Sequence, residues 1–359
     1  MGSAVARRLA GAAAGPLELT HIFDRRAALK RGAFDDISSS PPSIIWTNRI
    51  DDLLTSDVDV VIEALGGVDD AVAWMEASLL SGKSVVTSNK QAIAHHGPEL
   101  QRLAARQGRQ IRFEAAVGGA MPIVRTLGEA LAGDRVRRIT AILNGTTNAV
   151  LSQMEARRCS MEEALADARA RGYAEADPAD DLDGVDAAAK LAILCALGFG
   201  LRIGPAEIET RSSAATTAAD VEKAGRRGEA VRQLAYASYD ALRGELTAWV
   251  APAAVPRESW FAGITGPQNA AVISGAFAGD IRLCGTGAGG EATAVAVIGD
   301  LLAIARDRSA IVPAPVLSRP KRIIGVTTYS AECAEPAGEG LLCGFSDLRG
   351  DRAGRAEAV

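Results

Sequence analysis

The sequence predicts an α/β fold in which a doubly wound parallel sheet is followed by an α+β unit. With 359 residues the chain is long enough for two domains, and 48% apolar with 23% charged residues is an ordinary globular balance. Short β-branched apolar runs alternate with helical stretches through its first third, which is typical of a parallel sheet. After about residue 118 this alternation gives way to glycine-rich turns that open helices.

The chain begins with a helix over residues 2–10, in which Val5 and Leu9 lie four apart on one apolar face. In a doubly wound sheet, ligands lie beyond the carboxyl ends of the strands. Those ends carry Asp24-Arg25-Arg26, Leu65-Gly66-Gly67 and Ser88-Asn89-Lys90. The strands are expected at 17–23, 43–46, 58–65, 84–88 and 110–117, with helices at 68–81 and 97–108.

The opening of the chain departs from the pattern of a dinucleotide-binding sheet. Such a sheet starts with a strand and a G-x-G-x-x-G turn before the first helix, whereas this chain begins at Met1-Gly2 in the helix itself. Gly2 resembles the last glycine of that fingerprint. We interpret this half as a Rossmann-type domain whose first strand is missing. Truncation is the favoured explanation, because loss of that strand would expose buried edges and remove amides that hold a pyrophosphate.

Two helix starts can be located in the second part of the chain. Residues 137–143 predict a strand that ends in NGTTN at 144–148, where the hydroxyls are placed to cap the next helix. Ser160 and Glu163 have capping-box spacing at the start of a helix over 160–171. That helix leads the chain to Gly172 and the loop that follows.

An acidic, turn-rich loop then runs into an amphipathic helix that carries a lysine. Asp186 and Lys190 are four residues apart and therefore share one helix face. Crowded carboxylates upstream repel one another unless a cation, an ammonium group or the lysine lies among them. The alternative is a solvated loop followed by an ordinary ion pair. The upstream carboxylates are Glu175, Asp177, Asp180, Asp181 and Asp183.

The remaining sequence completes the division into domains. Alternating segments lie around 229–240, 245–250 and 269–275, and a glycine turn with a helix of small residues follows in 283–305. We predict a first domain over 1–118, a second over 119–287 and a disordered tail over 329–359, where glycine, alanine and charges follow no period. The helix of 288–328 is expected to pack back onto the first domain.

Composition excludes several classes of function. The net charge is −5, with 44 acidic and 39 basic residues, and aromatic residues make up 4%, so neither nucleic acid nor a membrane surface is an expected partner. The longest apolar runs are too short to span a bilayer, and no signal peptide is recognisable. Five cysteines without CxxC spacing indicate reduced thiols in a cytoplasm and make a zinc site improbable.

Five segments together resemble the homoserine dehydrogenase family. They are VVTSNK (85–90), EAAVGGAMPIV (114–124), NGTTNAVL (144–151), GYAEADPADDLDGVDAAAKLAIL (172–194) and GTGAGGEATAVAVIGDL (285–301). The segments come in the family's order, and the resemblance covers the chain from Met1 to about residue 328. No ACT regulatory domain is expected after it, because the remaining residues lack a strand-helix pattern.

The resemblance implies roles for the residues around the acidic loop. Lys190 resembles the family's catalytic lysine, which exchanges a proton with the substrate hydroxyl, and which needs a lowered pKa to do so near neutral pH. Lys90 resembles a second active-site lysine, shared between cofactor and substrate. Glu175 and Asp186 resemble the carboxylates that hold the ammonium group of L-homoserine or L-aspartate 4-semialdehyde, with Asp181 in support.

The resemblance also implies a cofactor site and a cation site. The nucleotide would be NADP or NAD: Asp24 could accept from a ribose hydroxyl, while Arg25 and Arg26 could bind a 2′-phosphate, which slightly favours NADP. The residues expected near the cofactor are Met1, Gly2, Arg25, Gly66, Ser88, Lys90, Gly172, Gly287 and Gly289. A monovalent cation such as sodium is expected at Glu114, Val117, Gly119 and Met121, because oxygen ligands suit a hard cation.

Three functional hypotheses follow. The first is an active, cytoplasmic homoserine dehydrogenase, which the resemblance predicts to be a homodimer working in threonine, methionine and isoleucine biosynthesis. The second is a truncated homologue that has lost activity and acts as a binding protein. The third is another amino-acid dehydrogenase on the same scaffold, and the combination of Lys190 with Glu175 and Asp186 argues against it, because this set suits a small amino alcohol.

Overall fold

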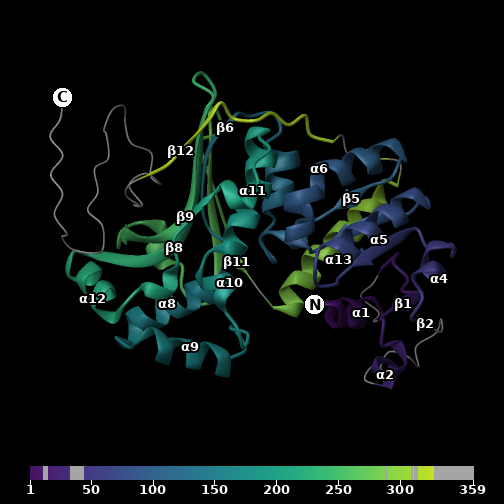
Figure 1. The fold of residues 1–359 in the computed structure, drawn as a ribbon, viewed down its shortest axis with the longest axis horizontal. Coiled ribbons are helices and arrows are strands. Elements are labelled where there is room, and N and C mark those ends of the chain that lie inside the picture. Colours follow the sequence, from purple (N-terminus) through teal and green to yellow (C-terminus); the bar gives the residue numbers. More distant parts are fainter. Residues whose placement is uncertain (11–14, 33–43, 288, 309, 311–313, 327–359) are drawn as a thin grey trace.

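The structure is a computed structural model that describes residues 1–10, 15–32, 44–287, 289–308, 310 and 314–326. The tail predicted over 329–359 lies outside the described residues. Figure 1 shows two halves, with strands β1 to β5 and their helices in one and a large sheet in the other. None of the described helices combines the length and the apolar composition needed to cross a bilayer.

The first half contains two small parallel sheets. β1 pairs only with β2, and β3, β4 and β5 form the other sheet in that order; within the described residues no ladder joins β1 to β3. The expectation of a parallel α/β arrangement is confirmed. The strands are β1 (His21–Phe23), β2 (Ile45–Thr47), β3 (Val60–Glu63), β4 (Ser84–Thr87) and β5 (Ile111–Arg112). The helices are α1 (Gly2–Ala10), α2 (Ala27–Arg31), α4 (Ile50–Leu54), α5 (Asp69–Leu80) and α6 (Lys90–Arg106).

Two predicted elements have different bounds in this half. The strand expected over 110–117 is only two residues long, because the chain turns into a 3-10 helix at Glu114–Ala116. The helix expected from residue 97 begins at Lys90, where the side chain of Asn89 accepts a hydrogen bond from the Ala92 amide at 3.0 Å. This cap outweighs Pro98, which lies inside the helix.

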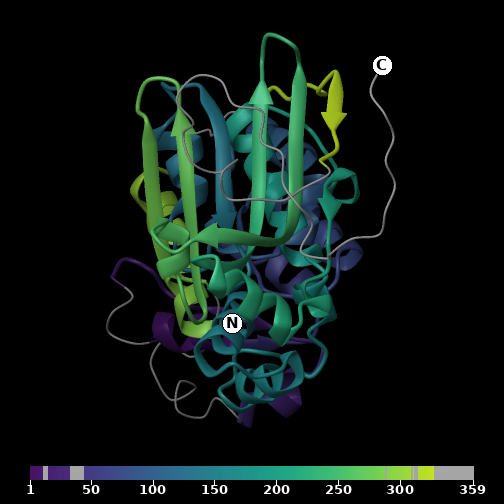
Figure 2. The same cartoon turned by 90° about the vertical axis from the view of Figure 1, so that its left-hand side faces the viewer.

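The second half is built on a seven-stranded mixed sheet. Its order is β11-β10-β6-β8-β9-β12, and β7 also pairs with β9. Figure 2 shows the strands side by side, with yellow β12 at the margin of the sheet. The strands are β6 (Val136–Ile142), β7 (Glu209–Thr210), β8 (Glu229–Asp240), β9 (Glu245–Pro256), β10 (Gln268–Gly275), β11 (Asp280–Thr286) and β12 (Arg322–Ile324). The helices are α7 (Ile123–Arg125), α8 (Gly145–Arg157), α9 (Met161–Ala170), α10 (Ala179–Leu182), α11 (Val185–Phe199) and α12 (Ala218–Arg226).

Helix α11 joins the two halves through one apolar core. Its buried residues, including Leu191 and Leu194, share a cluster with Leu100 of α6, Ile139 of β6 and Val250 of β9. Figure 1 shows α11 and α6 where the large sheet meets the half that contains β5. The capping box predicted at Ser160 and Glu163 is confirmed at the start of α9.

The chain returns to the first half in α13 (Gly290–Arg306), which packs on α1 through Val5, Leu9 and Val297. The helix predicted over 288–328 is wrong in its second part. It ends at Arg306, and Arg322–Ile324 pair with β9 instead. Pro315 and Pro320 lack the backbone N–H that a continued helix would need.

Candidate active site

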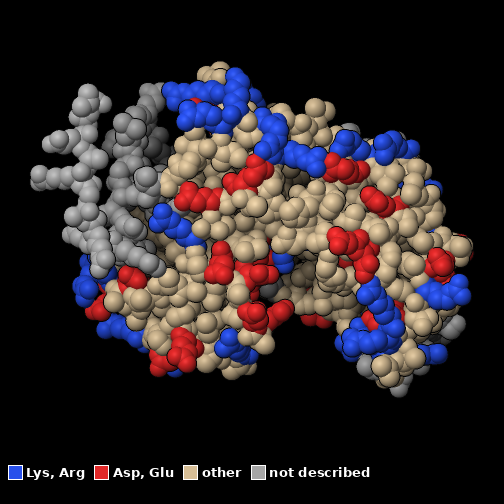
Figure 3. All heavy atoms as spheres, viewed as in Figure 1, with Lys and Arg blue, Asp and Glu red and all other residues tan. Residues whose placement is uncertain are grey.

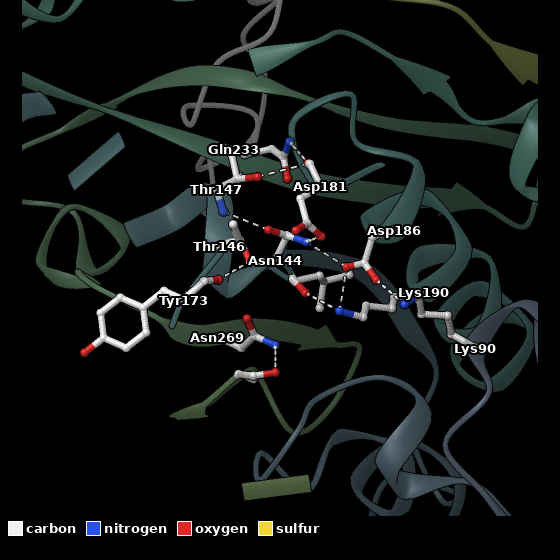
Figure 4. A network of polar contacts seen from close by, with 12 residues as sticks. Lys90, Asn144, Thr146, Thr147, Tyr173, Asp181, Asp186, Lys190, Gln233 and Asn269 are labelled. Carbon is white, nitrogen blue, oxygen red and sulfur yellow. Dashed lines mark hydrogen bonds and ion pairs between the residues drawn. The ribbon is translucent and has the colours of Figure 1, made fainter. Parts of the chain in front are cut away.

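Two lysines from different halves of the protein meet at one buried carboxylate. Asp186, in the first turn of α11, lies one helical turn before Lys190, whose ammonium group donates to Asp186 Oδ2 at 2.6 Å. Lys90, the first residue of α6, forms an ion pair with Asp186 Oδ1 at 2.8 Å. Figure 4 shows both lysine side chains directed at this carboxylate. Sequence spacing predicted the first contact, and the packing of α6 against α11 creates the second.

The backbone at the start of α11 is fixed by a glycine. Gly184 has φ of +79° and its missing side chain leaves room for Val250, since a Cβ there would lie 3.0 Å from Val250 Cγ1. The left-handed conformation lets the acidic loop turn sharply into the helix. Asp186 is then buried, with 4% of its surface exposed.

The charged side chains at this site shift one another's pKa values. Burial alone would raise the pKa of Asp186, but the charges of Lys190 and Lys90 outweigh it and hold that pKa well below its usual range. Burial likewise works to lower the pKa of Lys90, but Asp186 more than compensates, and the pKa of Lys90 is raised. The carboxylate is therefore ionised and both ammonium groups are bound to it.

Asn144 connects this cluster to the acidic loop. Its amide nitrogen donates to Asp186 Oδ2 at 2.9 Å and to Asp181 Oδ1 at 2.6 Å, while its oxygen accepts from the Thr147 amide at 2.8 Å and caps α8. Burial raises the pKa of Asp181, although Asn144 acts in the opposite direction. No pattern in the sequence indicated a role for Asn144 at the site, although its position before a helix in NGTTN is that of a helix cap.

The hydroxyls of NGTTN do not cap α8 as predicted. Thr146 donates to the Tyr173 carbonyl at 2.8 Å and Thr147 donates to the Asp181 carbonyl at 2.9 Å, so both hold the acidic loop. Asn144 caps α8 instead, because its side-chain oxygen, just before the helix, reaches the amide of Thr147, the third residue of the helix. Thr146 and Thr147 thereby link the amino end of α8 to the acidic loop.

Glu175 lies apart from this cluster. Its side chain is exposed, and its carbonyl accepts from Arg169 at 3.4 Å. Within the described part of the chain, no hydrogen bond or ion pair joins its carboxylate to Lys90, Lys190 or Asp186. Gly172 lies just after α9, where its amide donates to the Arg169 carbonyl at 3.0 Å.

The ends of β3 and β4 are tied together beside Lys90. Thr87 donates to the carboxylate of Glu63, which also accepts from the Leu65 amide at 2.6 Å. Asn89 donates to the Gly67 carbonyl at 2.7 Å. These contacts place the loops of Gly66 and Ser88 next to each other, at the edge where ligands of parallel sheets lie. Burial raises the pKa of Glu63, which is not among the predicted site residues.

The amino ends of α1 and α13 converge on the same edge. A Cβ added at Gly290 would lie 3.7 Å from the Met1 nitrogen, and one at Gly2 would lie 3.6 Å from Ala64 at the end of β3. Gly289 precedes the first turn of α13. Exposed amides at helix amino ends and glycines suit the phosphates of a dinucleotide, so the residues present fit NAD(P).

The loops of Gly119 and Gly287 pack against each other. Gly119 has φ of +63°, and a Cβ there would lie 2.6 Å from the Gly287 carbonyl oxygen. Asn269, which is fully buried, donates to the same oxygen at 3.5 Å. Contact between segments this far apart in the chain couples the predicted cation loop to the predicted cofactor loop.

Glu114, which is predicted to bind a cation, lies buried beside Asp300 and Arg125. Its carboxylate accepts from the amides of Val124 at 2.8 Å and Arg125 at 2.9 Å, and its own amide donates to Asp300 at 2.9 Å. Burial raises the pKa of both carboxyls, and Arg125 lies between them. Val117 and Met121 are buried nearby.

Arg25 is held by neighbours at the end of β1. Its guanidinium pairs with Asp70 and lies 5.3 Å from the ring centroid of Trp74. Asp24 accepts from the Arg26 amide at 2.8 Å and pairs with Lys30, a hydrogen bond that lowers the pKa of Asp24. Both signs of charge therefore lie where the adenosine ribose of a Rossmann-type site would be.

The surface between the two halves is hollowed. Figure 3 shows this hollow at the centre of the molecule, with acidic side chains gathered along the rim nearest α8 and α10. Carboxylates along the rim of a depression can bind a cationic group such as an ammonium.

Known proteins show the same organisation. The sequence profile for the homoserine dehydrogenase NAD binding domain matches residues 1–114, and the homoserine dehydrogenase profile matches residues 122–302. The homoserine dehydrogenase of Mycobacterium leprae is 39% identical over 319 residues, which are 86% of this chain and 70% of that protein. That of Bacillus subtilis is 36% identical over 267 residues, 74% of this chain and 61% of the relative.

Solved structures agree. A homoserine dehydrogenase from Thiobacillus denitrificans superposes with a TM-score of 0.79 at 29% identity, covering 90% of this chain and 74% of that one. A hyperthermophilic archaeal homoserine dehydrogenase in complex with NADPH gives a TM-score of 0.68 at 28% identity, covering 84% and 93%.

A Rossmann-type domain joined to a second half, with a lysine and carboxylate cluster where helices of the two halves meet, defines an NAD(P)-dependent oxidoreductase. Profile matches to both parts, together with relatives at 39% identity, identify it more closely. The chain belongs to the homoserine dehydrogenase family.

Proposed function

We propose that this chain interconverts L-homoserine and L-aspartate 4-semialdehyde with Lys190 as the proton-transfer group. The observation that carries the proposal is the buried carboxylate of Asp186, which holds Lys190 on one oxygen and Lys90 on the other. The Asp186 carboxylate therefore holds the ammonium groups of two different helices close together. A fixed proton donor is what reduction of an aldehyde to an alcohol requires.

In aldehyde reduction, the ammonium of Lys190 donates a proton to the oxygen of the forming alcohol. An ammonium has three donors, and within the described residues two of those on Lys190 bind the Leu143 carbonyl at 2.8 Å and Asp186 at 2.6 Å. The third is available for substrate oxygen. In alcohol oxidation the neutral amine of Lys190 takes the hydroxyl proton, and Asp186 and Leu143 keep the nitrogen in place.

The acidic loop supplies the site for the substrate ammonium. Glu175 and Asp186, supported by Asp181, are the proposed ligands. Of these, Glu175 is the exposed carboxylate, whereas Asp186 is already bound to both lysines and to Asn144. The substrate ammonium would therefore depend most on Glu175, and Lys90 would attract the substrate carboxylate.

The nucleotide would lie across the carboxyl ends of β3 and β4. Met1, Gly2, Gly66, Ser88, Gly287 and Gly289 would approach it with backbone, and Lys90 would contact it from α6. When bound, its nicotinamide accepts or supplies the hydride of the reaction. Arg25 supports a preference for NADP, since its contacts with Asp70 and Trp74 keep a guanidinium at the end of β1.

A monovalent cation is proposed for the loop of Glu114, Val117, Gly119 and Met121. The Glu114 oxygens each accept one amide hydrogen bond, and a carboxylate oxygen has a second lone pair for a hard cation. An ion there would also steady Gly119 against Gly287. Titration of sodium chloride against potassium chloride at constant ionic strength, with thermal unfolding as readout, tests the site.

The proposed setting is a cytoplasmic homodimer in threonine, methionine and isoleucine biosynthesis. Light scattering after size-exclusion chromatography measures the oligomeric state. A mass of one chain at all concentrations would contradict the dimer.

The reaction itself is tested by following nicotinamide absorbance with L-homoserine, using NAD and NADP in parallel. L-Serine and L-threonine serve as matched controls, because they carry the same charges with a shorter or branched alcohol. Turnover of L-homoserine alone is the expected result. Nucleotide binding without turnover of any of the three would favour a binding protein, and turnover of a control would indicate another amino-acid dehydrogenase.

A further inference from the structure

A buried carboxyl group lies at the base of the exposed loop that follows β3. Glu63 is the last residue of β3 and is only 4% exposed, whereas the four residues after it, 64–67, are all exposed. We call residues 64–67 the β3 loop. A carboxylate that leaves water loses free energy unless hydrogen bonds satisfy its oxygens. The partners that Glu63 binds therefore indicate what this residue holds in place.

Each carboxylate oxygen of Glu63 binds a different segment. Oε1 accepts from the Leu65 amide at 2.6 Å, which fixes the near end of the β3 loop. Oε2 accepts from the hydroxyl of Thr87, the fully buried last residue of β4. Glu63 and Thr87 are opposite each other in the parallel pairing of β3 with β4, so the backbone ladder places them in contact. One carboxylate thus couples the β3 loop to the end of β4.

Thr87 extends this connection to α6. Its side-chain oxygen accepts from the Asn89 amide at 2.9 Å. The side chain of Asn89 donates to the Gly67 carbonyl at 2.7 Å, and its oxygen caps α6. A ring of hydrogen bonds is thereby closed, which holds the β3 loop at Leu65 and at Gly67. Glu63 is the member of the ring that binds both the loop and β4.

The β3 loop is open between its two fixed points. A Cβ added at Gly66 or Gly67 would meet no atom within 4 Å, and Gly67 has φ of +83°. Among the described residues, the amides of both glycines donate to no backbone carbonyl. Free amides beside a residue in the left-handed conformation can bind an anionic or carbonyl group. The loop therefore offers its backbone to a ligand while side chains fix both of its ends.

The other segment that the ring fixes carries Lys90. Asn89 is the cap of α6 and Lys90 is the first residue of that helix. The Lys90 ammonium group forms the ion pair with Asp186 Oδ1 at 2.8 Å. A helix that loses its cap loses the hydrogen bonds that order its first turn. Changes in the ring therefore reach the lysine cluster through the first turn of α6.

We propose that Glu63 is a positioning residue of the nucleotide site. Its carboxylate fixes the β3 loop directly and fixes Lys90 through Thr87 and Asn89, so nucleotide affinity and the placement of Lys90 depend on one buried group. This inference rests on the proposed function, because Glu63 acts only through residues that are proposed to contact the nucleotide.

The first test is Thr87→Val in the 359-residue chain. Loss of the hydroxyl disconnects Glu63 from Asn89 while the shape of the side chain is kept. The Kd for NADPH, measured by nicotinamide fluorescence, is expected to rise about tenfold. Thr87→Ser restores the hydroxyl and should remain within about twofold of wild type. Equal losses in both variants would show that the hydroxyl is not what matters and would overturn the proposal.

Thr47→Val is the matched control. Thr47 is the buried last residue of β2, and its hydroxyl likewise donates to a carboxylate, that of Asp52, and accepts from the amide two residues later at 3.0 Å. This pair has no link to α6. Its loss should lower the melting temperature as Thr87→Val does, yet change the Kd for NADPH less than about twofold. Equal weakening of NADPH binding by both variants would indicate general loosening of this half and contradict the proposal.

A double-mutant cycle with Lys90→Met tests the connection to the lysine. If the ring acts through Lys90, the combined loss of NADPH affinity in Thr87→Val with Lys90→Met is at least about threefold smaller than the product of the single losses. Thr47→Val with Lys90→Met should give the full product. A full product in both cycles would overturn the connection between the ring and Lys90.

Glu63→Leu tests the carboxylate itself. Amide hydrogen exchange at Leu65 is expected to accelerate about tenfold or more, and the Kd for NADPH to rise about tenfold. Thr87→Val keeps the bond between Glu63 and Leu65, so exchange at Leu65 should change far less there. Unchanged exchange and affinity in folded Glu63→Leu would exclude Glu63 as a positioning residue. Binding is measured without homoserine, so absence of turnover would contradict the proposed reaction and not this role.

Discussion

The lysine site and the nucleotide half of this protein are stabilised in different ways. β8 and β9 pair over twelve residues each, in a seven-stranded sheet whose core includes α11. The strands of the nucleotide half are two to four residues long and form two separate sheets. Asp186 and Lys190 are therefore placed by a helix that packs on a continuous sheet, whereas the nucleotide loops depend on individual side-chain contacts.

The residues of one site are therefore held in two ways, by elements of the large sheet on one side and by separate side-chain hydrogen bonds on the other. Asn144, which follows β6, donates hydrogen bonds to Asp181 of α10 and to Asp186 of α11. On the other side, Asn89 and Thr87 hold the ends of β3 and β4 together. Lys90 is the first residue of α6 in the nucleotide half and forms an ion pair with Asp186 in the other half, so its position depends on both halves.

The largest effect is expected from Lys190→Met. Loss of the proton-transfer group should lower kcat about 10²- to 10⁴-fold while the Kd for NADPH changes less than about threefold. Steady-state kinetics and fluorescence titration measure the two quantities. Lys223→Met on the exposed side of α12 is the control. Equal losses of turnover and nucleotide binding would remove Lys190 from the chemistry.

Asp186→Asn should be the next most damaging change. It leaves two ammonium groups at a neutral amide, and the Lys190 side chain is only 12% exposed, so the change is expected to lower the free energy of unfolding by about 3 kcal/mol. Because folding lowers the pKa of Asp186, its stabilisation is present above about pH 4 and is lost as the pH falls through its folded pKa.

Urea unfolding of wild type and Asp186→Asn between pH 3 and 8 measures this difference. The gap in free energy should be full near neutrality and should narrow toward acid. Folding raises the pKa of Lys90, so its stabilisation persists until the pH rises above its ordinary value of about 10.4. A gap that stayed constant down to acid would argue that Asp186 is not ionised in the folded protein.

Gly119→Ala tests the contact between the predicted cation loop and the predicted cofactor loop. The added Cβ would meet the Gly287 carbonyl at 2.6 Å in a left-handed backbone conformation, so a loss of about 2 kcal/mol in unfolding free energy is expected. The KM for the nucleotide should rise with it. Gly133→Ala is the matched control, since a Cβ there has no neighbour within 4 Å. Similar behaviour of the two variants would show that the loops are not coupled.

The smallest effect is expected from Glu175→Gln. Its carboxylate is exposed and contributes through the substrate alone, so KM for L-homoserine should rise about tenfold with little change in kcat or stability. Glu222→Gln, at an exposed site on α12, is the control. An unchanged KM would exclude Glu175 as a ligand of the substrate ammonium.

Local sequence signals predicted most elements of the fold. The apolar spacing of α1 and the capping box of α9 depend on residues three or four apart, and both are confirmed. The strand expected over 110–117 failed because QIRFEAAV has strand-like composition, yet Glu114 turns to meet Asp300. A contact between residues so far apart in the chain leaves no local pattern.

Residues of the candidate site were likewise predicted where their partners are close in sequence and missed where their partners are distant. Spacing on one helix predicted that Asp186 and Lys190 would meet, and they do. Asn144 and Glu63 were missed as residues of the site, because their partners Asp186 and Thr87 lie 42 and 24 residues further along the chain. Their side chains are common caps and strand-end groups when considered alone.

By itself the sequence determined the α/β class, the helix that carries Lys190 and the family to which the chain belongs. These depend on periodicity and short motifs, which the chain encodes locally. Only the tertiary structure decided that Lys90 shares Asp186 with Lys190 and that, within the described residues, β1 and β3 belong to separate sheets. Both arise where packed helices or sheets bring distant parts of the chain together, and burial there sets which charges pair.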